Sequence, residues 1–173
     1  MTSEPGPRSL ILLRHAKAEH PERVTDIQRP LSLVGRRQAG QVGAALAADG
    51  MVPDLVLCSA SVRTRQTWEL ARATLGSTPD VRFEEGIYYA GARELLEIVR
   101  EVSDDVRTLL VVGHEPTVSH LAAALAGPES DPATVARVRA GVPTASWSLL
   151  TVGTPWRELD SGGATLRGLT LAE

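Results

Sequence analysis

Short apolar runs, each followed by polar or glycine-bearing residues, set the pattern of the chain. Three strong runs lie at 9–13, 54–58 and 108–112, and a weaker one covers 81–83. Apolar runs of this length, bounded by turn-forming residues, are typical of buried strands. We therefore expect four strands along the first two thirds of the chain.

Between these runs, apolar residues recur at the spacing of an amphipathic helix. The first helix is expected to begin after Ser32, a residue type that caps helix N-termini, and to end at Gly50. The same spacing predicts further helices at 61–75, 93–102, 117–126 and 131–139.

The C-terminal third predicts an antiparallel addition to the sheet. Residues 145–152 and 156–159 flank a Gly-Thr-Pro turn and indicate a hairpin, and 166–171 indicates an edge strand. Strands that alternate with helices predict an α/β fold, here a three-layer α/β/α sandwich with a mostly parallel sheet.

Composition limits the classes of protein that this chain can be. At 173 residues it predicts one domain over 9–173, preceded by a flexible segment at 1–8. Its 43% hydrophobic and 3% aromatic residues predict an aliphatic core. The net charge of −3 disfavours nucleic acid as a partner, and the absence of a long apolar stretch disfavours a membrane, so a cytoplasmic location is expected. The single cysteine, Cys58, excludes a disulfide framework.

The residues that follow the three strong runs carry the candidate chemistry. Arg14 and His15 follow the first, Arg63 lies shortly after the second, and His114 follows the third. Because the carboxyl ends of parallel strands share one edge of a sheet, these four side chains should converge there. Two arginines and two histidines suit an anion with several oxygens, so phosphate is the leading ligand. A neutral imidazole can also attack phosphorus, provided that its other nitrogen keeps its proton.

These segments resemble the motifs of the histidine phosphatase superfamily. Residues 12–16 resemble its Arg-His-Gly signature, with Ala16 in place of the glycine. Residues 59–67 resemble its second segment, in which an arginine precedes Gln-Thr, and 111–116 resemble its Gly-His turn. The segment 26–32, with its Arg-Pro-Leu, is similar to the small phosphohistidine phosphatases of the SixA type. The resemblance implies a phosphoglycerate mutase-like fold without a large cap domain.

The resemblance also implies roles for the four residues. His15 is the expected nucleophile and becomes phosphorylated, while Arg14, Arg63 and His114 bind the phosphoryl oxygens. Water then hydrolyses the phosphohistidine intermediate. No metal and no cofactor are expected, and the sequence contains neither a His-Glu-x-x-His pattern nor a Walker A motif.

The general acid is the open position in this scheme. Relatives place it in the region of Glu85 or directly after the second histidine, at Glu115, and we favour Glu85 among the catalytic residues. Neither carboxylate is needed if the leaving group is good. An imidazole leaves readily once it is protonated, whereas an alkoxide needs a positioned acid.

The sequence thus predicts a hydrolase that acts on phosphohistidine in a phosphorylated protein, with a phosphate ion binding in its site. One alternative is a phosphomonoesterase that acts on a small phosphoester. A non-catalytic module that binds phosphate is the third reading. His20, in the loop after the nucleophile, is either a substrate contact or an ordinary surface residue.

Overall fold

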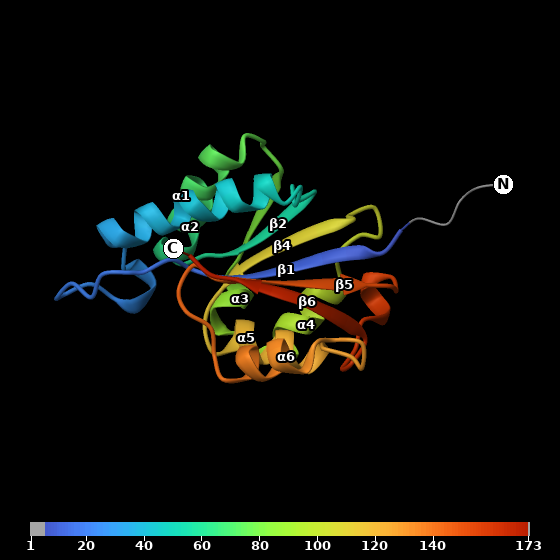
Figure 1. The fold of residues 1–173 in the computed structure, drawn as a ribbon. Coiled ribbons are helices and arrows are strands. Elements are labelled where there is room, and N and C mark those ends of the chain that lie inside the picture. Colours follow the sequence, from blue (N-terminus) through green and yellow to red (C-terminus); the bar gives the residue numbers. More distant parts are fainter. Residues whose placement is uncertain (1–5, 173) are drawn as a thin grey trace.

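The computed structural model describes residues 6–172, which form a six-stranded sheet with helices on both faces (Figure 1). The strands are β1 (Arg8–Arg14), β2 (Leu55–Ser59), β3 (Asp80–Glu84), β4 (Thr108–Gly113), β5 (Trp147–Val152) and β6 (Ala164–Thr170). The helices are η1 (Asp26–Gln28), α1 (Leu33–Ala48), α2 (Val62–Leu75), α3 (Glu85–Tyr89), α4 (Ala92–Arg100), α5 (Thr117–Leu125), α6 (Pro132–Arg139) and η2 (Trp156–Glu158). Of the segment predicted to be flexible, residues 1–5 lie outside the described residues, and Arg8 already belongs to β1.

The strand order is β3-β2-β4-β1-β5-β6, and the first four strands run parallel. In the registers, Arg14 of β1 lies opposite Gly113 of β4, and Cys58 of β2 lies opposite Val112. The ends of β1, β2 and β4 are therefore level at one edge of the sheet. This edge receives the polar residues that follow each strand.

Helices cover both faces of the sheet, which confirms the three-layer prediction. Helices α1 and α2 lie on one face, and α3 to α6 lie on the other (Figure 1). Leu10 and Leu12 of β1 join the core under α4 and α5, while Ile11 and Leu13 join the core under α1 and α2. Burial on both faces explains why the strands are apolar throughout instead of alternating.

Two glycines allow α1 to pack closely against its neighbours. A Cβ at Gly43 would lie 1.9 Å from the backbone oxygen of Ala71 in α2. A Cβ at Gly35 would lie 1.9 Å from the backbone oxygen of Lys17, in the loop after β1. The first contact packs the two helices together, and the second holds that loop against the start of α1.

The hairpin predicted for 145–152 and 156–159 is wrong, because the second segment contains a 3₁₀ helix, η2. Trp156 is fully buried there, and its Nε1 donates to the backbone oxygen of Val106 at 2.8 Å. Burial of this large indole in the aliphatic core takes the segment away from the sheet. Strand β5 pairs antiparallel with β6 instead, so the predicted edge strand is the true partner.

The structure also contains two short helices that the sequence did not predict, η1 and α3. Within residues 6–172 there is no inserted cap domain, and no helix is both long and apolar enough to cross a membrane.

Candidate active site

His15 lies directly after β1 and is 8% exposed. Its Nδ1 donates to the backbone oxygen of Ala16 at 2.7 Å, because a carbonyl can only accept. Burial lowers the pKa of His15 to about 3, and the nearby His114 and Arg63 act in the same direction, against the Ala16 hydrogen bond. The ring is therefore neutral at pH 7 and its Nε2 carries a free lone pair.

Backbone hydrogen bonds hold this segment from two sides. The amide of Ala16 donates to Thr67 Oγ1 at 3.0 Å. The amide of Ala145 donates to the carbonyls of both Arg14 and His15, at 3.1 and 3.0 Å. Ala16 is fully buried and is not among the described residues with positive φ, so this position does not need the glycine of the family signature.

Arg63, in the first turn of α2, is 6% exposed and makes contacts through both terminal nitrogens. Nη1 donates to the backbone oxygen of Asp26 at 2.7 Å, and Nη2 donates to Asp26 Oδ2 at 3.0 Å. Nη2 also lies 3.4 Å from Nδ1 of His114. The Nε of Arg63 is buried and has no hydrogen-bond partner.

Arg14 shows the same feature from the other side of the site. Its Nη1 donates to the backbone oxygen of Val142 at 2.8 Å, while its Nε is buried without a partner. Buried donors in proteins are nearly always paired, and an unpaired one costs about 1–3 kcal/mol. Two buried guanidinium groups, each with an unpaired donor, thus lie at this edge of the sheet, and guanidinium groups favour an anion as their ligand.

His114 follows β4, and its Nε2 lies 2.7 Å from Ser59 Oγ at the end of β2. Burial lowers the pKa of His114 to about 4, and Arg63 acts in the same direction. Its ring centroid lies 5.5 Å from that of His15. Because Arg63 Nη2 can only donate, Nδ1 of the neutral His114 ring accepts from it, and Nε2 carries the proton and donates to Ser59 Oγ.

The four residues predicted from the strand ends line one open cavity of about 370 Å³. The other residues that line it are Lys17, Ala18, His20, Arg29, Glu115 and Thr144. His20 is thus at the cavity, and its Nε2 accepts from Arg29 Nη2 at 3.0 Å. Within residues 6–172, no cluster of three or more His, Cys, Asp or Glu side chains is placed to hold a metal ion.

The two candidate acids differ in their surroundings. Glu115 lines the cavity, but its carboxylate accepts from the amide and hydroxyl of Ser119, both at 2.8 Å, and from the amide of Val142 at 3.0 Å. Glu85 is the first residue of α3, is exposed, and is not among the residues that line the cavity. Its role as the acid stays a prediction.

Three polar residues at this edge were not singled out by the sequence. Asp26 accepts from Arg63, Tyr88 donates from its hydroxyl to Asp26 Oδ2 at 2.5 Å, and Ser59 contacts His114. Asp26 and Ser59 both lie within the family-like segments, which was the available signal. No sequence pattern indicated Tyr88, because its hydrogen-bond partner Asp26 lies 62 residues away in the chain.

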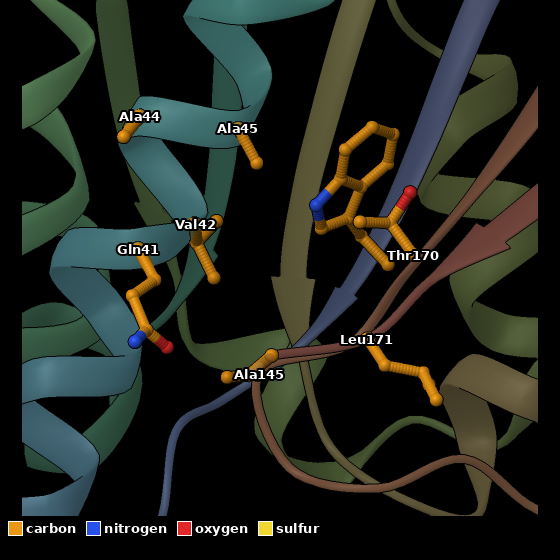
Figure 2. A pocket seen from close by; sticks show the side chains of 9 residues that line it. Gln41, Val42, Ala44, Ala45, Ala145, Thr170 and Leu171 are labelled. Carbon is orange, nitrogen blue, oxygen red and sulfur yellow. The ribbon is translucent and has the colours of Figure 1, made fainter.

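A second cavity, of about 390 Å³, lies between α1 and the ends of β5 and β6 (Figure 2). It is lined mainly by small and apolar side chains, among them Val42, Ala45, Ala145 and Leu171. Because no titratable side chain lines it, it does not compete with the first cavity as a site of chemistry.

The comparisons with known proteins agree with this geometry. Residues 10–88 match the family model of the histidine phosphatase superfamily, branch 1. An uncharacterised protein of Mycobacterium tuberculosis is 40% identical over 157 residues, which are 90% of this chain and 97% of that protein.

Two solved structures extend the match over nearly the whole chain. A protein from Nakamurella multipartitia with the provisional name phosphohistidine phosphatase SixA is 32% identical, with a TM-score of 0.84 over 98% of this chain and 99% of that one. The protein histidine phosphatase SixA in complex with tungstate shares the fold at 21% identity, with a TM-score of 0.72 over 94% and 96% of the two chains. The chain therefore belongs to the histidine phosphatase superfamily, within its group of SixA type.

Proposed function

We propose that the protein is a phosphohistidine phosphatase that works through a covalent intermediate on His15. One observation carries this proposal: Arg14 and Arg63, each with a buried Nε that has no partner, line the same cavity as His15, whose Nδ1 is held by the Ala16 carbonyl. A phosphoryl group in this cavity would lie beside both guanidinium groups and the nucleophile. The provisional name of the Nakamurella relative supports the same activity.

In the first step, Nε2 of His15 attacks phosphorus in line with the bond to the leaving group. The P–Nε2 bond forms, and the phosphorus–nitrogen bond of the substrate breaks, so the phosphoryl group passes from one imidazole to another. Arg14, Arg63 and His114 donate to the equatorial oxygens, where charge is spread in the transition state. Removal of one such donor typically costs about 3 kcal/mol of barrier.

His15 becomes an imidazolium when it is phosphorylated, because its Nδ1 keeps its proton. The carbonyl of Ala16, 2.7 Å away, stabilises that cation. In the second step water attacks phosphorus, the P–Nε2 bond breaks, and inorganic phosphate and neutral His15 are released. In the neutral His114 ring, Nδ1 accepts from Arg63 Nη2 at 3.4 Å and Nε2 donates to Ser59 Oγ at 2.7 Å. To donate to a phosphoryl oxygen, His114 takes a second proton on Nδ1, which the negative charge of the bound phosphoryl group favours.

The preference for phosphohistidine follows from the leaving group. Glu115 is occupied by three donors, and Glu85 is not among the residues that line the cavity. An alkyl ester needs a positioned acid to expel its alkoxide, whereas a protonated imidazole does not. The arrangement therefore favours a phosphorylated histidine over a simple alkyl phosphate, and we infer that the substrate is a phosphoprotein.

The test uses a phosphohistidine protein and an aryl phosphate, each with and without a chelator. We expect turnover of both in chelator, and a protein-bound label that is acid-labile and alkali-stable. His15→Ala should show neither turnover nor label. His120→Ala is the matched control, because His120 is exposed on α5 and does not line the cavity. Undiminished turnover by His15→Ala would rule out the mechanism, and loss of turnover in chelator would indicate a metal-dependent enzyme.

A further inference from the structure

The Asp26 side chain collects hydrogen bonds from three parts of the active-site edge. Arg63 of α2 donates to Oδ2 at 3.0 Å and to the Asp26 backbone oxygen at 2.7 Å. Tyr88 of α3 donates to the same Oδ2 at 2.5 Å, and Arg29 donates to Oδ1 at 2.9 Å. The connection between β1 and α1 is thereby tied to α2 and α3.

Asp26 has no proton to offer in this arrangement. The Tyr88 hydroxyl, then Arg29 and Arg63, hold the pKa of the carboxyl well below its usual range, although its side chain is 52% exposed. It is therefore a fixed negative charge that accepts hydrogen bonds. A fixed negative charge close to an anion site repels the anion, so its presence there calls for a compensating role.

The contacts to Arg63 supply that role. A guanidinium is planar, so fixing both terminal nitrogens also fixes the direction of the Nε–H bond. In Arg63 the terminal nitrogens are held by Asp26, and Nε is the buried donor that lacks a partner. Tyr88 supports the same assembly, because its ring meets the His114 ring edge-on, with centroids 5.4 Å apart.

We propose that Asp26, held in place by Tyr88, is a positioning residue that orients the Arg63 guanidinium so that its Nε–H meets the phosphoryl group in the transition state. This inference rests on the proposed function, since it concerns Arg63, one of the residues proposed to bind the phosphoryl oxygens. Asp26 does not touch the substrate in this role.

The decisive observation is the sign of the effect on anion binding. Asp26→Asn removes a negative charge, which by electrostatics alone tightens the binding of every oxyanion. If Asp26 orients Arg63, the same change instead weakens the anion that resembles the transition state. The probes are inorganic phosphate, which resembles the product, and vanadate, which takes up the five-coordinate geometry of in-line transfer.

We expect Asp26→Asn to lower kcat for aryl phosphate by about 10- to 100-fold, because a small misplacement of a catalytic donor has effects of that size. Vanadate should bind at least about 10-fold more weakly, while phosphate affinity changes by less than about 3-fold. Asp26→Glu, which keeps the charge, should recover part of kcat. Glu22→Gln is the control, because it removes an exposed carboxylate from the same loop that is not among the described partners of Arg63.

Tyr88→Phe keeps the charge of Asp26 and removes only the hydroxyl, so it tests the inference even if Asp26→Asn does not fold. We expect a loss of vanadate affinity in the same direction, about 3- to 10-fold, from the loss of one hydrogen bond to a charged group. Equal or tighter binding of both anions by Asp26→Asn, or unchanged vanadate affinity in Tyr88→Phe, would overturn the inference. Calorimetry measures the anion affinities without turnover. A lack of phosphohistidine phosphatase activity can therefore be distinguished from a failure of the positioning role of Asp26.

Discussion

Replacing Glu115 with glutamine separates a structural role for this carboxylate from a role as the general acid. Oε1 accepts from the Ser119 amide, and Oε2 accepts from the Ser119 hydroxyl and the Val142 amide. Glutamine supplies one oxygen and one NH₂ group. Whichever position the NH₂ takes, it faces a backbone N–H that then has no acceptor.

The cost follows from that one unpaired amide. A buried donor left without a partner destabilises by about 1–3 kcal/mol. In a chain of this size each kcal/mol lowers Tm by about 2–4 °C, so Glu115→Gln should melt several degrees below the wild type. The Val142 carbonyl holds Arg14 Nη1, so a moderate loss of activity should accompany the loss of stability.

Thermal unfolding, with turnover of phosphohistidine and of an alkyl phosphate, measures both effects. Glu129→Gln is the control, since Glu129 is an exposed carboxylate on the loop between α5 and α6. We expect the two substrates to be affected alike. An unchanged Tm together with a selective loss of alkyl phosphate hydrolysis would refute the structural reading and make Glu115 the acid.

Three further predictions concern separate features of the molecule. Glu85→Gln should leave the turnover of phosphohistidine unchanged. If Glu85 acts as the general acid, the same variant should hydrolyse an alkyl phosphate more slowly than the wild type. Burial lowers the pKa of His15 to about 3 and of His114 to about 4, from an ordinary value of 6.5, so the unfolded chain binds protons that the folded one does not. Stability should therefore be full above pH 6.5 and fall as the pH drops below it, with a smaller fall in His15→Ala, as measured by urea unfolding at pH 7 and 5. Gly43→Ala should destabilise the protein by about 1–3 kcal/mol, because its Cβ would overlap the Ala71 backbone, and an unchanged urea midpoint would contradict that close packing.

The local pattern of apolar and polar residues was sufficient to predict the strands of the sheet and the main helices that cover it. The apolar run at 9–13 correctly predicted β1. The run is continuous because Leu10 to Leu13 are all fully buried between two helical layers. The segment at 156–159 was wrongly predicted as a strand for a related reason. Its apolar residues are indeed buried, but Trp156 enters the core from a 3₁₀ turn, and periodicity over so few residues cannot distinguish the two.

The four cavity residues at the strand ends were predictable from the sequence, whereas the residues that hold them in place were not. Arg14, His15 and His114 could be brought together because parallel pairing of β1 with β4 aligns their ends, as the register of Arg14 with Gly113 confirms. The contact of Tyr88 with Asp26 joins two short helices, α3 and η1, and no periodic pattern relates the two. Their meeting depends on the path that the connection between β1 and α1, which contains η1, takes along the sheet edge.

The sequence by itself determined the alternation of strands and helices, the family, and the convergence of Arg14, His15, Arg63 and His114 at one cavity. Each of these depends on local apolar patterning or on short motifs at strand ends. The tertiary structure alone decided that the Nε atoms of Arg14 and Arg63 are left without partners, that Glu115 is occupied by three donors, and that Asp26 holds Arg63. Each of these properties depends on contacts between residues that are far apart in the sequence. Their energetic effect depends on burial, because an unpaired donor or a fixed charge is costly only where water is excluded.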